Sequence, residues 1–373
     1  MKVVKVRSPF IIEVNEAGAI GSKVELFIYP YGSSVPATPT YTLSKLNPST
    51  TQLNTSYNVS NYVKEYIDNI KATYVPFYGE LEQNNEWVKF QVKRYKLVGS
   101  TYTELGTATE YIGVNGFTDY TSGNQEPSEV KILLLSNPNI NNYYYKAPTY
   151  PNTLTQYFNL LVDKPTAATT IIDVKYERID GSIYEYTNNL GVGFGGIFNF
   201  AQPITPVKAN GNFVNGCKVT ITYTPETGSP IILPSFYTYP IEECKYTPVL
   251  CDFINRYGGW QTITFFKAQT NAVSVKGSEY NLLPDVIDYN IYKGQSKVFN
   301  INGTQTVKLN TGWVDENYNE LITDLLLSET VLLDQKPVKV KTQSHTYKTK
   351  LKDKMINFEI DFEYAFDLIN NVI

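Results

Sequence analysis

Few side chains in this sequence can do acid–base or nucleophilic chemistry. His345, in the polar run Thr342–Tyr347, is the only histidine, so any Ser-His-Asp mechanism would have to use it as the proton shuttle. No G-x-S-x-G elbow is present, and the surrounding residues read as a polar strand. We therefore expect a solvated or hydrogen-bonded histidine at this position rather than a catalytic one.

The cysteines do not follow a metal-binding pattern. Cys217, Cys244 and Cys251 are an odd number and contain no C-x-x-C. Cys244 and Cys251 together with His345 supply too few ligands for a tetrahedral zinc site unless a carboxylate joins them. We expect all three cysteines to be small buried apolar side chains in a reducing compartment, and we expect no metal and no cofactor.

The run Gly191–Gly196 (GVGFGG) formally matches the dinucleotide fingerprint. That motif holds a pyrophosphate only where a strand leads into it and a helix N-terminus follows. Pro203 and Pro206 prevent a long helix after these glycines, and no acid lies about 20 residues further on to hold a ribose. The run therefore predicts a flexible or closely packed glycine loop.

Two groups of carboxylates could in principle cleave glycosidic bonds as an acid–base pair. One is Glu242 with Glu243, and the other is the acidic cluster within Asp315–Asp324. The acids of the second group also fit the start of a helix, where the helix dipole favours negative charge. Neither group identifies a catalytic residue, and we predict a protein that is not an enzyme.

Composition favours contact surfaces over catalysis, since 31 Tyr and 18 Phe stand against one His and two Met. With 32 Lys and Arg against 36 Asp and Glu, the net charge is −4. This balance predicts no stable binding to nucleic acid. No apolar run approaches the roughly 20 residues that span a membrane, and Met1–Phe10 is too charged for a signal peptide. We expect synthesis in a cytoplasm.

Alternation of apolar and polar residues dominates the chain and indicates β-strands. It is clearest in Lys23–Tyr29, Trp87–Tyr95, Thr170–Tyr176 and Lys218–Tyr223, and turn-forming Gly and Asn clusters separate such runs. The pattern predicts a mainly β fold of tandem antiparallel β-sandwich domains, similar to Ig or fibronectin modules, with an α+β C-terminal part.

Helical periodicity occurs in two places. Ser60–Lys71 has a serine cap, and Asp315–Ser328 has acids in its first turn. After the second helix, Pro337–Lys341 and Ile356–Glu363 alternate again, with lysines on the outer face of one and carboxylates on the outer face of the other. We expect these two segments in one antiparallel sheet with the two charged rows adjacent.

Two segments rich in Tyr and Pro, Asn142–Pro151 and Tyr239–Thr247, read as linkers. They divide the chain into a β-sandwich domain at 1–145, a second β domain at 146–243 and a C-terminal β domain at 244–373. Aromatic runs in such linkers favour interdomain packing, a protein interface or a glycan platform. The tyrosines concerned are Tyr143, Tyr144, Tyr145, Tyr237 and Tyr239.

Three stretches resemble virion structural proteins of tailed phages that infect Bacteroidetes, including crAss-like phages. They are Ser8–Tyr29, Glu243–Ala268 (ECKYTPVLCDFINRYGGWQTITFFKA) and Asn310–Ile373, which contains NTGWVDENYNELITDLLLS. The residues that match the group's pattern are Asn255, Gly258, Trp260, Gln261, Trp313, Leu325, Leu326 and Ser328. The central turn places an aromatic beside a polar amide, which suits either a hairpin wedged against another domain or subunit or a role for Trp260 in its own core.

The resemblance implies a non-enzymatic structural protein that forms a ring in the tail or head–tail connector of a virion. Its partners would be further copies of itself and other tail or connector proteins. Asn255, Trp260, Gln261 and Trp313 join the five tyrosines as candidate interface residues. The alternative is a carbohydrate-binding or adhesion module on the virion or the cell surface, which the tyrosines and tryptophans suggest.

Overall fold

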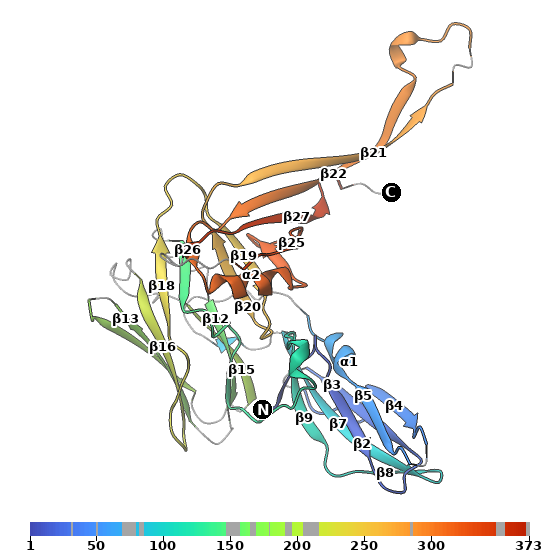
Figure 1. The fold of residues 1–373 in the computed structure, drawn as a ribbon, viewed down its shortest axis with the longest axis vertical. Helices are drawn as coiled ribbons and strands as arrows, with labels where there is room; N and C mark the ends of the chain where they lie inside the picture. Colours follow the sequence, from blue (N-terminus) through green and yellow to red (C-terminus); the bar gives the residue numbers. More distant parts are fainter. Residues whose placement is uncertain are drawn as a thin grey trace. The chain divides into compact units, whose positions relative to one another are not determined.

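The computed structural model is mainly β, as predicted (Figure 1). It describes residues 1–30, 33–49, 51–68, 80–81, 86–146, 157–164, 169–178, 180–190, 196–203, 216–283, 286–347 and 355–370. They form two compact units: unit 1 contains Met1–Ile241 and Phe253–Thr262, and unit 2 contains Glu242–Asp252 and Ile263–Ile373. Most strand pairs are antiparallel, while the Ig-like or fibronectin-like topology, the α+β C-terminal part and the three domain boundaries stay predictions.

The first sheet of unit 1 has the order β1-β9-β7-β3-β4, with β8 beside β7, and β2 pairs with β5. The strands of these two sheets are β1 (Val3–Lys5), β2 (Ile11–Asn15), β3 (Gly21–Tyr29), β4 (Tyr41–Leu46), β5 (Asn54–Asn58), β7 (Trp87–Val98), β8 (Thr101–Glu104) and β9 (Thr109–Val114). Alternate residues of β3 and β7 form the core, among them Leu26 and Phe90, both fully buried. The alternation read from the sequence therefore identified the core face of these two strands correctly.

Two further sheets complete unit 1, with orders β10-β12-β15-β6 and β11-β18-β16-β13-β14, and β17 pairs with β16. The strands are β6 (Glu80–Leu81), β10 (Ile132–Leu134), β11 (Asn142–Lys146), β12 (Tyr157–Lys164), β13 (Thr170–Glu177), β14 (Ile183–Leu190), β15 (Gly196–Pro203), β16 (Cys217–Pro225), β17 (Ile231–Ile232) and β18 (Phe236–Ile241). A short 3-10 turn, Tyr120–Ser122, lies between β9 and β10 in the chain. Strand β15 begins at Gly196, so a strand rather than a helix follows the glycine run, whose other residues lie outside the described part.

The linker interpretation is wrong for Asn142–Lys146 and for Tyr239–Ile241, which belong to strands. Residues 242–247 of the second segment form no strand and follow the boundary between the two units at Ile241 and Glu242. Asn142–Lys146 is β11, and it pairs in parallel with β18, which contains Tyr239. A run of tyrosines has no polar positions to mark alternation, but tyrosine itself favours strands and places one ring inside and the next outside. The remainder of the first segment lies outside the described residues.

Both helices are shorter than predicted. Helix α1 covers Ser60–Lys64, and Ser60 does not cap it, because its hydroxyl donates to the carbonyl of Ser8 at 2.7 Å. Residues 69–71 of the predicted helix lie outside the described part. Helix α2 covers Tyr318–Leu326, and Asp315 precedes it, accepting a hydrogen bond from the amide of Asn317 at 3.0 Å.

The large sheet that includes the strands of unit 2 has the order β20-β19-β24-β25-β27-β22-β21, and β23 pairs with β26. The strands of these two sheets are β19 (Val249–Ile254), β20 (Trp260–Phe265), β21 (Thr270–Asn281), β22 (Ser296–Asn310), β23 (Val314–Asp315), β24 (Val331–Leu333), β25 (Lys336–Val340), β26 (Met355–Ile356) and β27 (Glu359–Asp367), and a 3-10 turn covers Ile291–Lys293. Strands β25 and β27 pair antiparallel, and Lys341 contacts Glu363 at 3.1 Å. The predicted adjacency of the lysine and carboxylate rows is therefore confirmed.

Candidate functional site

The turn between β19 and β20 lies within unit 1, where its polar side chains are buried. Asn255 donates from Nδ2 to the carbonyl of Leu135 at 2.8 Å and to Oε1 of Gln261 at 3.1 Å. Oε1 of Gln261 also accepts from the amide of Asn137 at 3.0 Å, and the carbonyl of Trp260 accepts from Asn159 at 2.9 Å. These bonds join the turn to two other segments of unit 1 as one buried polar network.

Glycines let this turn approach its neighbours closely. Gly258 has φ +88°, and a Cβ there would lie 2.9 Å from the amide nitrogen of Gly116. At Gly259 a Cβ would lie 2.5 Å from the Cβ of Leu135. Only glycine fits both positions, because one needs the left-handed backbone and both lack room for a side chain.

Tyr143 and Tyr145 are also buried in unit 1. The hydroxyl of Tyr143 donates to the carbonyl of Asn137 at 3.2 Å, and its ring packs edge to face on Phe236 with centroids 4.9 Å apart. Burial raises the pKa of Tyr143 well above its usual range. With Asn255, Trp260 and Gln261, these tyrosines contact other residues of unit 1, so their side chains are not a surface that a partner could reach.

The other candidate residues are at least partly accessible. Tyr237 is 45% exposed and Tyr239 is 37% exposed, and their rings lie 6.5 Å apart with planes 23° from parallel. The ring of Tyr144 stacks on Tyr239 at 5.7 Å from the neighbouring strand, so three tyrosines form a row on the outer face of the sheet. Trp313 is 54% exposed and belongs to unit 2, whereas the three tyrosines of the row belong to unit 1.

A recess of about 330 Å³ opens beside the row. Tyr237 and Tyr239 line it together with Glu177, Arg178 and Lys218. Glu177 and Lys218 are cross-strand partners on β13 and β16, and Lys218 is the partner of Tyr237 on β18. A carboxylate, two cations and aromatic rings therefore lie around one opening on the sheet's outer face.

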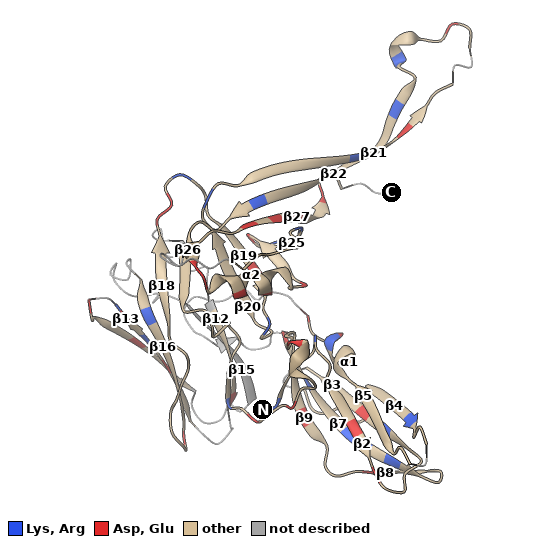
Figure 2. Ribbon diagram, viewed as in Figure 1, with Lys and Arg blue, Asp and Glu red and all other residues tan. Residues whose placement is uncertain are grey.

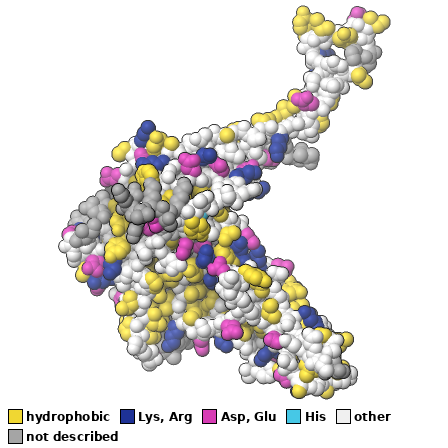
Figure 3. Space-filling view, viewed as in Figure 1, with side chains coloured by type: hydrophobic (Ala, Val, Ile, Leu, Met, Phe, Trp, Pro, Cys, Tyr) yellow, Lys and Arg dark blue, Asp and Glu magenta, His cyan; other side chains and the backbone are white. Residues whose placement is uncertain are grey.

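The most exposed apolar surface of unit 2 was not predicted as a site. It belongs to the hairpin of β21 and β22, hereafter the arm, which extends beyond the other strands of its sheet (Figure 1). Every residue of β21 is exposed, and at the far end Leu283 is 83%, Ile287 99% and Tyr292 92% exposed. Figure 3 shows hydrophobic side chains gathered along this end of the hairpin.

The sequence of the arm differs from that of the core strands. Thr270–Tyr280 alternates like a strand, and the run that follows it, Asn281–Tyr292 (NLLPDVIDYNIY), is apolar but interrupted by Pro and Asp. An apolar run that turn-forming residues interrupt cannot continue a strand into a core. Such a run marks an exposed apolar loop.

The side chains considered for catalysis have structural partners. Nε2 of His345 lies 3.2 Å from Oδ1 of Asn319, and its ring packs against Tyr347 and Phe358 with centroids 5.3 Å apart in each case. Glu243 accepts a 2.9 Å bond from the ammonium group of Lys267, which holds the pKa of Glu243 below its usual value.

The cysteines differ from one another in burial. Cys217 and Cys251 are buried free thiols, and burial raises the pKa of Cys217. Cys244 is exposed, which corrects the prediction that all three are buried. Within the described ranges, no group of three His, Cys, Asp or Glu side chains could hold a metal ion.

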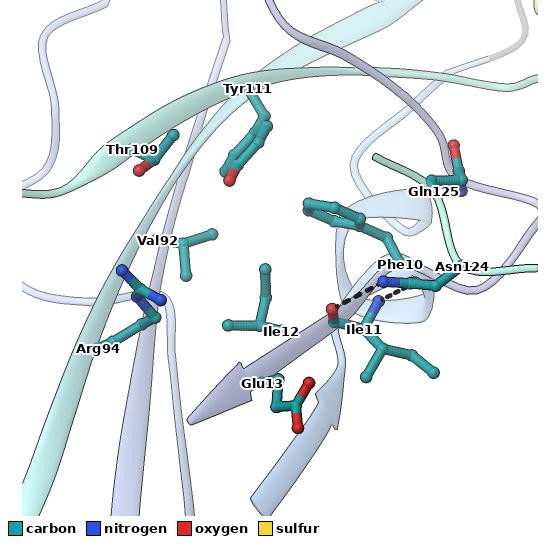
Figure 4. Close-up of a pocket in the computed structure, with 10 residues that line it drawn as sticks. All are labelled: Phe10, Ile11, Ile12, Glu13, Val92, Arg94, Thr109, Tyr111, Asn124 and Gln125. Carbon is teal, nitrogen blue, oxygen red and sulfur yellow. Dashed lines mark hydrogen bonds between the residues drawn. The ribbon is translucent and has the colours of Figure 1, made fainter. Parts of the chain in front are cut away.

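A second recess, of about 300 Å³, opens on the first sheet (Figure 4). Phe10, Ile12 and Tyr111 supply apolar walls, and Asn124 exchanges two hydrogen bonds with the main chain of Ile11, at 2.9 and 3.2 Å. The side-chain amide of Asn124 therefore fixes its loop to the edge of β2. This recess reads as a gap between packed elements rather than as a ligand site.

These surfaces define a mainly β protein with exposed aromatic and apolar elements in its described part. The sequence matches no model of a known protein family and no curated protein. Among the described residues no helix is long and apolar enough to cross a membrane.

Proposed function

We propose that the chain is a non-enzymatic structural protein of a tailed-phage virion, where it forms a ring in the tail or head–tail connector with other copies of itself and neighbouring tail or connector proteins. The observation that carries this proposal is the exposed apolar arm, Thr270–Asn310. An isolated two-stranded hairpin is marginally stable in water, and a large exposed apolar surface marks a contact site. The phage context rests on the resemblance of Ser8–Tyr29, Glu243–Ala268 and Asn310–Ile373.

The chemistry of the candidate catalytic groups supports a structural role. A hydrolase needs an acid or base free to exchange a proton with its substrate. Glu243 is instead paired with Lys267, and the ring of His345 contacts the rings of Tyr347 and Phe358. Both side chains stabilise unit 2 locally, which fits a protein that acts by contact.

The proposal is tested on the full-length chain and on a variant with a shortened arm. Lys276 and Asn302 are direct partners on β21 and β22, so an Asn-Gly turn can replace Gly277–Ile301 and close the hairpin at that pair. We expect the full chain to form rings by mass photometry and electron microscopy and to occur in purified virions. The shortened variant should fold with an unchanged Tm and lose the ring.

A full-length chain that stays monomeric at high concentration and is absent from virions contradicts the proposal. A shortened variant that still forms rings shows that the assembly contact lies outside the arm. In that case the chain is still a structural protein, but the arm is not the surface through which it assembles.

A second candidate function is carbohydrate binding, which the row of Tyr144, Tyr237 and Tyr239 favours. Aromatic rings beside charged groups can hold a sugar through apolar ring contacts and hydrogen bonds. The test is a glycan array with the wild type and with Tyr237→Ala/Tyr239→Ala. Tyr120→Ala is the matched control, because Tyr120 is fully exposed but lies outside the row. Loss of a glycan signal in the double variant alone supports this function, and absence of any signal from the wild type removes it.

A further inference from the structure

The far end of the arm lacks the partners that a stable hairpin needs. Among the described residues, strand β21 pairs only with β22, and β22 pairs with β27 only from Thr304 to Asn310. Beyond the register shift after Lys276, Ser278–Asn281 pairs with Ser296–Phe299, and no third strand joins these two segments in the described part. Both outer edges of this distal hairpin therefore present backbone N–H and C=O groups that no strand covers.

The distal hairpin also exposes apolar side chains, and its two aromatic rings lie on one face. Tyr280 and Phe299 pack edge to face at 5.5 Å, yet they are 45% and 43% exposed. Val298, the cross-strand partner of Glu279, alternates with Phe299 along β22 and is also exposed. Exposed aromatic rings beside open strand edges are typical of a surface that a partner covers.

Charge and backbone chemistry limit what can cover this surface. Glu279 and Asp288 balance Lys293 and Lys297 in the described part of the distal arm, and Figure 2 shows no gathering of basic residues there. A nucleic acid or an anionic membrane surface would need a cluster of cations. The hydrocarbon interior of a bilayer would leave the open strand edges without hydrogen bonds. A protein remains as the partner.

A second copy of this chain fits the two open edges in a way that an unrelated protein does not. Strands β21 and β22 run antiparallel, so the outer edge of β21 in one copy can pair antiparallel with the outer edge of β22 in the next. Each copy then uses both edges, and the contact repeats around a ring until it closes. Ring closure leaves no strand edge open.

We propose that the distal arm is a self-association element in which β21 residues Ser278–Asn281 of one copy pair with β22 residues Ser296–Phe299 of the neighbouring copy. The apolar loop that joins the strands, with Leu283, Ile287 and Tyr292, packs against its equivalents at the end of the paired arms. This inference rests on the proposed ring assembly and names the contact that closes the ring.

Cross-linking between two singly substituted chains tests the pairing. One chain carries Tyr280→Cys and the other Lys297→Cys, both with Cys244→Ser to remove the exposed thiol. Tyr280 and Lys297 are cross-strand partners, so they lie at the same height of the arm, and a short bis-maleimide reagent reaches between neighbouring strands. We expect the mixture to give dimers linked from position 280 to position 297, while either chain alone gives few dimers.

Hydrogen exchange supplies an independent readout on the unmodified chain. Assembly should slow amide exchange in Ser278–Asn281 and Ser296–Phe299 by roughly tenfold or more relative to the dilute monomer, because paired edges are protected. Thr101–Glu104, the exposed edge strand β8 of unit 1, is the internal control and should keep its rate.

The outcomes separate the two proposals. Rings without slowed exchange in the distal arm, or with links only between identical positions, overturn the edge pairing and leave the assembly role standing. A chain that never oligomerises overturns both. Rings with 280-to-297 links and slowed exchange support both.

Discussion

The side-chain amide of Asn255 donates a 2.8 Å hydrogen bond to the carbonyl of Leu135, which lies 120 residues earlier in the chain. Asn255 is fully buried, and its Oδ1 also accepts from the amides of Tyr257 and Gly259, at 2.9 and 3.3 Å. One side chain therefore both shapes the β19–β20 turn and attaches it to the segment after β10. Two consequences for stability follow from this arrangement.

Replacing Asn255 should destabilise unit 1. Asn255→Ala leaves the carbonyl of Leu135 and the amide of Gly259 buried without this partner, which costs about 2–3 kcal/mol in the free energy of unfolding. Urea denaturation measures the loss. Asn61→Ala, an exposed position in α1, is the matched control and should change the free energy by less than about 0.5 kcal/mol. Equal stability of the two variants would show that the network contributes nothing.

Alanine at Gly258 should lower the stability of the protein more than alanine at another glycine with positive φ. Gly258 (φ +88°) and Gly106 (φ +66°) both lie in the left-handed region, where a Cβ costs about 1–2 kcal/mol. Nothing lies within 4 Å of a Cβ at Gly106, whereas the Cβ at Gly258 would meet backbone of Gly116. We expect G258A to lower the midpoint of urea unfolding well below that of G106A. If both variants unfold at the same midpoint, the close approach in the turn is not needed.

The periodic parts of the fold could be predicted because their information is local. In β27, Ile360 and Phe362 are buried while Glu359 is exposed, as the period-two pattern indicates. The burial of Asn255 and Gln261 could not be read in this way, because their partners Leu135 and Asn137 are distant in sequence and use main-chain atoms. Main-chain partners leave no signature in residue type.

The arm escaped prediction for a different physical reason. Val273 and Val275 alternate with polar residues as they would in a strand packed on a core. Whether such a face is buried depends on whether another layer lies over it, and the strand's own sequence does not contain that information. Tyr144 shows the same limit, since it lies at the surface between the buried Tyr143 and Tyr145.

The core of the C-terminal sheet should depend on Phe362. Its ring is fully buried and packs edge to face on Phe265 with centroids 5.8 Å apart. We expect Phe362→Ala to lower the free energy of unfolding of unit 2 by about 3–5 kcal/mol, measured by urea denaturation. Phe366→Ala, at a half-exposed position of the same strand, should cost less than about 1 kcal/mol. If both variants lose a comparable free energy of unfolding, Phe362 does not belong to the core of this sheet.

The ion pair between Glu243 and Lys267 should make the stability of unit 2 depend on pH in a defined direction. Lys267 lowers the pKa of Glu243 in the folded protein relative to the unfolded chain, so its contribution is present above the unfolded value of about 4.5 and is lost as pH falls through the folded value. Lys267→Met removes the cation but keeps the apolar stem.

The variant should therefore be less stable than the wild type in urea at pH 7, and the difference should shrink as the solution is taken toward pH 3. Lys276→Met is the matched control, because Lys276 is exposed on the arm and should show no such change with pH. Raised salt should reduce the difference at pH 7, since an ion pair with one exposed partner is screened. A difference that stays constant from pH 7 to pH 3 would mean that packing of the lysine stem, and not its charge, supports this part of unit 2.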